Sequence, residues 1–382
     1  MRIAIFHNYL DNIGGAEIVT LTLARALSAD VYTTNISQEN IAKMGFADVS
    51  KRIYSLGRIP KSAPFRQQIA LWKFRRLNLS GKYDFFIIAG DWAMSGAVNN
   101  HPNLWYAHSP LNELWEFTGF IKQELLSFWK KPLYDIWVLV NRRLSLKYAR
   151  SVDNWVANSN NTKLRIEKYY QQTAKVIYPP VACSAYQASA SQVLDSQVVK
   201  TAGDYWLSVN RLAAHKRPEI QLEAFKDLPD EHLIMVASYE EGVAQFEACK
   251  ARIDNYNLAN VEIRHWVSDT ELKELYAHCR GFITTAQNED FGLTAVEAMA
   301  AGKPVIAPAE GGYLESVLSG RTGALIKDIG GASLRQAILQ VSTNLKNNPN
   351  YYQAACYEQA ARFDTAVFIK AIKEIIDQPH GK

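Results

Sequence analysis

An alternation of short apolar runs with amphipathic helical segments constrains the fold more than any other feature of the sequence. In the second half of the chain the apolar runs fall at residues 206–209, 233–237, 261–265, 281–284 and 304–307. The helical patterns between them fall at residues 219–225, 246–256, 269–278 and 294–301. Short buried strands that alternate with helices are typical of a parallel sheet covered on both faces. The second half is therefore predicted to be a doubly wound α/β domain.

The first half of the chain shows the same alternation. It contains apolar runs at 3–6, 31–34, 85–89 and 155–157, with a helical pattern at 16–27. Two domains also fit the length of 382 residues, because a domain commonly has about 100 to 200 residues. Ligands of such sheets bind at the carboxyl ends of the strands, so we expect the site in a cleft between two doubly wound domains.

The predicted domain boundary is an uncharged segment at residues 176–194, which contains Pro179 and Pro180. Proline and small polar residues are typical of connections between domains. We therefore expect a first domain at residues 1–180, a linker at 181–194 and a second domain at 195–363.

The composition excludes several classes of protein. The four cysteines are far apart in the sequence and form no C-x-x-C pair, which argues against a zinc module or a disulfide scaffold. Residues 1–6 hold too short an apolar run for a signal peptide, and no window approaches a membrane span of about 18 to 20 apolar residues. A cytoplasmic protein is expected.

The charge is distributed unevenly along the chain. Residues 1–180 contain 23 basic and 13 acidic residues, a balance of +10, whereas residues 181–382 contain 19 and 25, a balance of −6. Within the first half, residues 51–82 hold nine basic residues and no acidic one. Such a stretch suits an anionic partner, although an ordinary solvated helix face has the same composition.

Two glycines at the start of the first predicted helix are candidates for anion binding. Gly14 and Gly15 precede Ala16 and Glu17 directly after the first strand and its loop. Glycine lets the backbone approach a ligand, and the amides at a helix start attract anions such as phosphate. The motif is not the six-residue dinucleotide fingerprint, and a plain tight turn remains an alternative.

A second motif, at residues 287–307, carries a stronger signal. A strand ends, an acidic turn with Glu289 and Asp290 follows, and a helix starts near Gly292 and is capped by Gly302. Glu289 and Asp290 can be explained as helix-capping acids. Glu297 is harder to explain in this way, because it lies among apolar residues, where a carboxylate is costly unless it is hydrogen-bonded.

With these motifs the chain resembles the retaining glycosyltransferase family 4, the group 1 glycosyltransferases. Glu289 and Glu297 are separated by seven residues within E-D-F-G-L-T-A-V-E-A-M-A-A-G-K-P-V-I-A, and further family landmarks occur in order at 14–17, 106–110, 156–159, 176–181, 211–217 and 311–315. The resemblance implies GT-B architecture, in which two Rossmann-like domains face each other across a cleft. It also implies that the first domain binds the acceptor, that the second binds a nucleotide-diphosphate sugar, and that a tail at 364–382 packs back on the first domain.

The resemblance also implies roles for individual residues. Glu297 matches a residue that binds the ribose hydroxyls, and Glu289 one that contacts the donor sugar. Arg211 and Lys216 match a basic pair that holds the diphosphate, and His108 matches a histidine that contacts the transferred sugar, although a lone histidine is more often structural. The implied catalytic set is His108, Arg211, Lys216 and Glu289. The implied donor-binding set is Gly14, Gly15, Arg211, Lys216, Trp266, Glu289, Phe291, Gly292, Leu293 and Glu297.

The sequence predicts a reaction without a metal ion or other cofactor. It contains no Asp-x-Asp, the carboxylate pair expected where a divalent ion bridges the diphosphate. The sequence departs from the family pattern at Ala182, Asn210 and Trp266, so the nucleobase of the donor stays open between uridine and guanosine.

The resulting expectation is a retaining transfer of a hexosyl unit from a UDP- or GDP-linked sugar to a hydroxyl of a glycan or lipid-linked saccharide in polysaccharide biosynthesis. Two alternatives remain, namely an epimerase acting on the nucleotide sugar and a catalytically silent subunit that binds it. Nucleic acid is not an expected partner. The basic stretch at 51–82, with Phe65, Trp72 and Phe74, predicts peripheral contact with an anionic membrane on its inner face.

Overall fold

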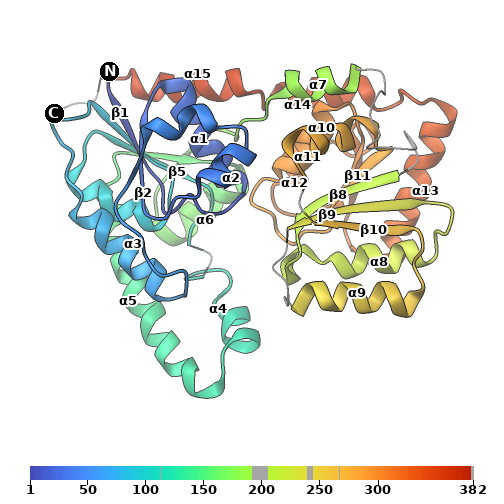
Figure 1. Cartoon of the computed structure of the whole chain (residues 1–382), viewed down its shortest axis with the longest axis horizontal. Helices are drawn as coiled ribbons and strands as arrows, with labels where there is room; N and C mark the ends of the chain where they lie inside the picture. The colour runs from blue at the N-terminus through green and yellow to red at the C-terminus, as the bar shows by residue number, and fades with distance from the viewer. Residues whose placement is uncertain (112, 192–204, 239–243, 266, 380–382) are drawn as a thin grey trace. The chain divides into compact units, whose positions relative to one another are not determined.

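Two parallel β-sheets organise the chain in its computed structural model, which describes residues 1–111, 113–191, 205–238, 244–265 and 267–379 (Figure 1). The chain divides into two units, Met1–Tyr178 with Phe368–Lys382, and Pro179–Val367. Each unit is built around one sheet, as the alternating pattern of the sequence predicts. The predicted α/β class with two Rossmann-like domains is confirmed.

Among the described residues of the first unit, seven parallel strands form a sheet in the order β3-β2-β1-β4-β5-β6-β7. Their bounds are β1 Ile3–Phe6, β2 Asp30–Thr33, β3 Ile53–Ser55, β4 Phe85–Ile88, β5 Asn103–Ala107, β6 Asn154–Ala157 and β7 Lys175–Val176. Strands β1 and β4 are buried at every residue. Short apolar runs of this kind form the centre of a sheet that is covered on both faces.

Helices cover both faces of this sheet. They are α1 Gly15–Leu27, α2 Gln38–Lys43, η1 Ala47–Arg52, α3 Phe65–Arg76, η2 Trp92–Asn99, α4 Thr118–Phe120, η3 Ile121–Leu125, η4 Phe128–Lys130, α5 Lys131–Ala149, α6 Asn160–Tyr170 and α15 Thr365–Ile376. Side chains alternate along β1, so Ile3 and Ile5 join one core cluster while Ala4 and Phe6 join the other. Helix α15 adds Phe368 to the cluster that contains Ile3 and Ile5.

In the described part of the second unit, six parallel strands form a sheet in the order β10-β9-β8-β11-β12-β13. The strands are β8 Tyr205–Arg211, β9 His232–Ser238, β10 Val261–His265, β11 Gly281–Ile283, β12 Val305–Pro308 and β13 Gly323–Ile326. The helices are α7 Cys183–Ser191, η5 Ala214–Lys216, α8 Pro218–Lys226, α9 Ala244–Tyr256, α10 Asp269–His278, α11 Leu293–Ala300, α12 Tyr313–Ser316, α13 Gly331–Asn347 and α14 Gln353–Ala361.

Part of the predicted linker is a helix. Residues 183–191 form α7, and the ring of Tyr186 packs edge-on against that of Tyr276 on α10, with 5.6 Å between centroids. Alanine and glutamine favour helices, and the buried tyrosine ties this one to the second unit. The uncharged composition alone did not distinguish this helix from a connection between domains.

The basic stretch at 51–82 differs from its expected form in one respect. Phe65 and Trp72 are exposed on α3, but Phe74 is fully buried against the sheet and the ring of Phe6. Its side chain therefore cannot enter a membrane, and that part of the sequence prediction is wrong. Two of the basic residues are also used within the unit, because Arg66 pairs with Asp11 and Lys73 donates to the carbonyl of Leu56 at 2.6 Å.

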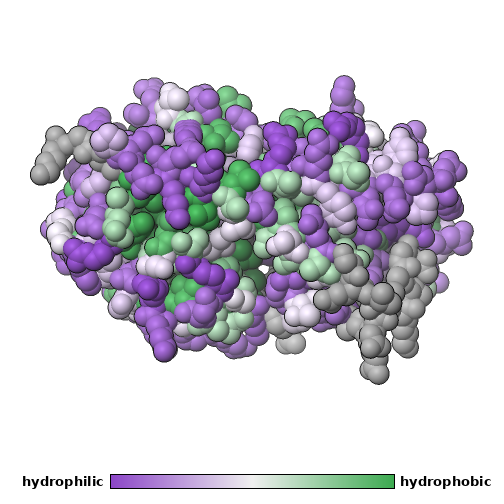
Figure 2. All heavy atoms as spheres, turned by 90° about the horizontal axis from the view of Figure 1, so that it is seen from above, coloured by the Kyte–Doolittle hydropathy of each residue, from purple (hydrophilic) through white to green (hydrophobic). Residues whose placement is uncertain are grey.

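The surface mixes hydrophilic and hydrophobic residues. Figure 2 shows one face on which hydrophilic residues predominate and the hydrophobic ones gather over the first unit. Within the described ranges, the helices are all too short or too polar to cross a membrane.

Candidate active site

The loop between β11 and α11 carries Glu289 and is fixed by two glycine positions. Gly292 precedes α11 with a φ of 87°, and an added Cβ would lie 2.4 Å from the ring of Tyr313. Gly311, with a φ of 59°, packs directly against the backbone of Glu289, because an added Cβ would lie 2.4 Å from the carbonyl oxygen of Glu289. The amide of Gly312 donates to that same oxygen at 2.8 Å. The backbone of Glu289 is therefore held between two tight turns.

Lys216 and Glu289 lie together, although 72 residues separate them in the sequence. The ammonium of Lys216, at the end of η5, forms an ion pair with the carboxylate of Glu289, and both side chains are mostly buried. The amide of Gln287 donates to the carbonyl of His215 at 2.7 Å, which joins the same two loops through the backbone. The structure thus brings together two of the predicted catalytic residues.

Arg217 strengthens this junction and was not predicted as a site residue. Its Nε donates to the carbonyl of Thr285 at 2.7 Å, and its guanidinium forms an ion pair with Glu310. The Thr285 hydroxyl lies within hydrogen-bond distance of the carbonyls of Lys216 and Arg217, at 2.8 and 2.9 Å. The sequence offers no signal for this role, because the partners lie far along the chain.

Arg211 lies at the last position of β8, with an exposed side chain. It lines a small pocket together with Lys216, and the other lining residues include Ser208, Asn210 and Gln221. The two predicted diphosphate-binding cations therefore border one pocket at the carboxyl end of β8. This is the edge at which ligands of doubly wound sheets bind.

Glu297 lies on α11 beneath two tyrosines. The hydroxyl of Tyr276 donates to its carboxylate at 2.9 Å, and Tyr186 also hydrogen-bonds to it. Burial raises the pKa of Glu297, an effect that the hydrogen bonds from the two tyrosines reduce. The expectation that this carboxylate needs hydrogen bonds among its apolar neighbours is confirmed.

The remaining donor-binding residues of the second unit have mixed positions. The side chain of Phe291 is buried and packs against Phe363, with 5.2 Å between ring centroids. It therefore serves the core, and only its backbone is available to a ligand. Leu293 starts α11 and is partly exposed. Trp266 lies outside the described residues.

His108 follows β5 in the first unit, with its ring edge-on to that of Tyr106 at 5.2 Å between centroids. Burial, with a smaller contribution from the charge of the nearby His7, lowers the pKa of His108 to about 3. The imidazole is therefore neutral at physiological pH. Its Nε2 is buried without a hydrogen-bond partner among the described residues, which is costly unless a ligand supplies one.

A pair of residues beside His108 was not predicted as part of the site. His7 directly follows β1, and its Nδ1 lies 3.0 Å from the hydroxyl of Thr20. Its Nε2 lies 4.0 Å from the carboxylate of Glu17. Although burial acts to raise it, the pKa of Glu17 is lowered, chiefly by its interaction with the imidazole of His7.

Gly14 makes room for this carboxylate. A Cβ at Gly14 would lie 2.7 Å from a carboxylate oxygen of Glu17. Gly15, in contrast, is the exposed first residue of α1. Glu17 belongs to the glycine motif, and His7 directly follows the first strand. Both residues therefore lie at the predicted sheet edge, but the sequence alone did not indicate that they interact.

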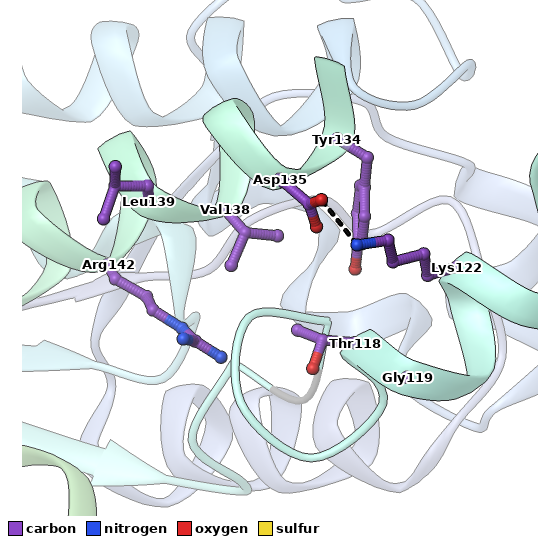
Figure 3. Close-up of a pocket in the computed structure, with 8 residues that line it drawn as sticks. All are labelled: Thr118, Gly119, Lys122, Tyr134, Asp135, Val138, Leu139 and Arg142. Atoms are coloured by element: carbon purple, nitrogen blue, oxygen red, sulfur yellow. Dashed lines mark hydrogen bonds and ion pairs between the residues drawn. The ribbon is translucent and has the colours of Figure 1, made fainter. Parts of the chain in front are cut away.

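A wider pocket lies elsewhere in the first unit, between α4 and α5 (Figure 3). Its lining residues are Thr118, Gly119, Lys122, Tyr134, Asp135, Val138, Leu139 and Arg142. None of these residues was predicted from the sequence to bind a ligand. Across the described ranges, no three His, Cys, Asp or Glu side chains come together as a metal ion would require.

The sequence of the second unit matches a known family. Residues 194–358 match the model of the glycosyl transferases group 1, and this range includes Lys216, Glu289 and Glu297. Residues 194–358 therefore form a group 1 glycosyltransferase domain. The family resemblance found in the sequence is thereby confirmed.

Similar proteins extend the match beyond the second unit of the chain. It is 26% identical to the alpha-1,3/1,6-mannosyltransferase ALG2 of Dictyostelium discoideum, over 87% of this chain and 88% of the relative. It is also 26% identical to the D-inositol 3-phosphate glycosyltransferase of Mycolicibacterium smegmatis, over 57% of this chain and 48% of the relative.

Solved structures agree with the fold. Anabaena HepE in complex with UDP and glucose has a TM-score of 0.75 at 20% identity, with 99% of this chain and 100% of that chain covered. Sucrose-phosphate synthase from Thermosynechococcus elongatus has a TM-score of 0.72 at 17% identity, with 99% and 98% covered. The glycosyltransferase therefore has the GT-B fold.

Proposed function

We propose that this glycosyltransferase moves a hexosyl unit from a nucleotide-diphosphate sugar to a hydroxyl of a glycan or lipid-linked saccharide, with retention of the anomeric configuration. The observation that carries the proposal is the position of Lys216, paired with Glu289 and bordering one pocket with Arg211. Two cations at the edge of a parallel sheet suit a diphosphate, on which negative charge grows as the sugar leaves.

The other residues of the second unit complete a donor site. In the proposed site Glu289, held by two glycine turns, accepts hydrogen bonds from sugar hydroxyls. Glu297, held by Tyr276 and Tyr186, accepts them from ribose hydroxyls. The amides at the start of α11 add positive potential for the phosphates.

The proposed reaction needs no nucleophile from the enzyme and no metal ion. The bond from the anomeric carbon to the diphosphate oxygen breaks, the acceptor oxygen bonds to that carbon on the same face, and the acceptor proton passes to the diphosphate. The neutral imidazole of His108 is available to hydrogen-bond a hydroxyl of the transferred sugar, because its Nε2 has no partner among the described residues.

Mannose is the first sugar to test, because the first of the similar proteins is a mannosyltransferase. Both UDP and GDP donors need testing, since the structure of HepE contains UDP while the departures at Asn210 and Trp266 leave the nucleobase open. For the acceptor we propose a lipid-linked saccharide at the cytoplasmic face of a membrane.

The test is a screen of UDP- and GDP-hexoses with the purified chain. Release of free sugar and nucleoside diphosphate in the absence of acceptor identifies the donor. Transfer with acceptor must then give a product whose new anomeric carbon has the configuration of the donor by NMR. An epimerised nucleotide sugar as the sole product would contradict the proposal, as would binding of every donor without turnover.

A further inference from the structure

Helix α5 is apolar on the side that faces away from its unit. Its buried residues, which include Val138, Asn141 and Tyr148, face the unit. On the opposite side lie the exposed side chains of Leu133, Ile136, Leu139, Val140 and Leu146. Ile136 is three residues from Leu133 and from Leu139, and four from Val140. Contiguous exposed apolar surface of this kind marks interaction sites in soluble proteins.

The segment before α5 extends this apolar surface with aromatic rings. Phe128 and Trp129 on η4 are 83% and 58% exposed. Phe117 and Phe120 are also exposed near α4. Figure 1 shows that α4 and α5 protrude from the sheet of the first unit and form a hairpin, defined here as residues 117–150.

Basic residues accompany the apolar ones along the hairpin. Residues 117–150 contain seven Lys or Arg and two Asp or Glu. Lys130 follows the exposed aromatics, with its ammonium 4.9 Å from the centroid of Trp129. Arg143 and Lys147 are exposed further along α5, on either side of Leu146, and the exposed Arg150 follows the helix. An apolar and aromatic tip with cations behind it complements a bilayer whose surface is anionic.

Polar contacts hold the hairpin in this form. Lys122 and Asp135 form an ion pair of 2.5 Å between its two arms, across the pocket drawn in Figure 3. The hydroxyl of Tyr134 donates to the carbonyl of Glu113, and Nε of Arg142 donates to that of Leu114, both at 2.7 Å. The apolar side of α5 is thus exposed by a defined packing arrangement.

We propose that the hairpin docks this glycosyltransferase on an anionic lipid bilayer. Phe128, Trp129, Leu133 and Ile136 enter the headgroup region, and the cations behind them contact lipid phosphates. The inference rests on the proposed function in one respect, since a lipid-linked acceptor requires an enzyme at the membrane. It differs from the sequence prediction, which assigned the contact to residues 51–82.

The experiment is co-sedimentation of the full chain with vesicles of phosphatidylglycerol and phosphatidylcholine, or of phosphatidylcholine alone. The test variant combines Phe128→Ser, Trp129→Ser and Leu133→Ser. The matched control combines Phe65→Ser, Trp72→Ser and Leu164→Ser, which removes the same three residue types from the same unit, at 63%, 50% and 63% exposure. The control also removes Phe65 and Trp72, the two exposed aromatics that the sequence prediction assigned to the membrane.

We expect the parent to bind the anionic vesicles only, and less at raised salt. The test variant loses about tenfold or more in vesicle partitioning, because burial of apolar side chains scales with their area, while the control stays close to the parent. Brominated lipids quench Trp fluorescence in the parent, and Trp129→Phe removes most of that quenching.

Equal binding of parent and test variant would overturn the proposal, as would equal losses in the test and control variants. A parent that is dimeric by light scattering, and monomeric with the three hairpin substitutions, would instead make this face a contact between two copies. Donor hydrolysis needs no membrane and is measured separately on the same samples. Vesicle binding without donor hydrolysis therefore refutes the proposed function alone, and hydrolysis without binding refutes the docking alone.

Discussion

The ammonium of Lys216 pairs with the carboxylate of Glu289, and this contact joins the loop after β8 to the loop before α11. The pair keeps a cation oriented at the sheet edge before any ligand arrives. Orientation of charge in advance is the main way in which proteins stabilise the charge that develops during a reaction. The same pairing also holds Glu289 where a sugar is expected.

The first prediction concerns this cation. Lys216→Ala lowers donor turnover about tenfold or more, because a charge-assisted contact at a site of developing charge contributes roughly 2 to 4 kcal/mol. The control is Lys163→Ala, which removes a partly exposed lysine that pairs with Glu167 on α6. Steady-state kinetics and circular dichroism are measured for both variants, and unchanged turnover in Lys216→Ala with a native spectrum would refute the role.

The second prediction concerns the pH dependence of stability at Glu297. Burial raises the pKa of this carboxyl above its usual 4.5, so the folded state binds its proton more tightly than the unfolded state. The contribution of the group to stability is therefore present below pH 4.5 and is lost as the pH rises through the folded pKa. Glu297→Gln has no carboxyl to titrate and therefore no such loss. The free energy of unfolding of Glu297→Gln minus that of the parent is expected to rise as the pH rises from 4.5 through the folded pKa.

Chemical denaturation at a series of pH values measures this difference. A constant offset between parent and Glu297→Gln at all pH values would contradict the assignment of the raised pKa. Binding of nucleoside diphosphate provides a separate readout. The neutral amide of glutamine forms weaker hydrogen bonds with ribose hydroxyls than a charged carboxylate does, so we expect Glu297→Gln to bind the nucleotide more weakly.

The third prediction concerns His108. Burial lowers its pKa from 6.5 to about 3, so the unfolded state binds a proton over that range while the folded state does not. The stability provided by the neutral ring is present above pH 6.5 and is lost as the pH falls toward 3. His108→Gln is therefore expected to weaken the acid dependence of the free energy of unfolding. NMR titration of the ring checks the pKa directly, and a value near 6.5 would contradict the burial argument.

The fourth prediction separates two effects at Gly292. Gly292→Ala adds a methyl group both at a φ of 87° and 2.4 Å from the Tyr313 ring, whereas Gly320→Ala adds one at a φ of 80° with open space around it. The backbone strain is shared, at about 1 kcal/mol or more. Gly292→Ala is therefore the more destabilising variant in thermal unfolding and also lowers turnover. Equal melting temperatures would show that the Tyr313 contact relaxes without cost.

The fifth prediction is that donor turnover survives exhaustive treatment with EDTA. We expect Arg211, Lys216 and the amides at the start of α11 to provide the positive charge that a divalent ion would otherwise supply. Loss of turnover in EDTA that returns with magnesium or manganese would show that these groups are insufficient.

Sequence reasoning succeeded where one local pattern determines the structure. Buried strands such as β1 and β4 have an apolar residue at every position, so their alternation with helices predicted both sheets. The motif with Glu289 and Glu297 predicted a strand, a loop and a helix, and the structure contains them in that order.

It failed where a role depends on contacts between distant parts of the chain. Arg217 interacts with Thr285 and Glu310, which no spacing in the sequence connects. His7, which directly follows β1, and Glu17, on α1, come together only in the folded first unit. The apolar residues of α5 have helical spacing on both sides, so the sequence alone does not show which side faces the solvent.

The central claim is that Lys216, at the end of η5, and Glu297, on α11, bind and activate a nucleotide-diphosphate sugar. The most direct measurement is turnover of the best donor in a UDP- and GDP-hexose panel by the parent, by Lys216→Ala with Glu297→Ala, and by the control Lys163→Ala with Glu167→Ala. The account predicts that the parent and the control turn over the donor at similar rates and that the double site variant, while still folded, is slower by about a hundredfold. Similar turnover by all three proteins would contradict the account.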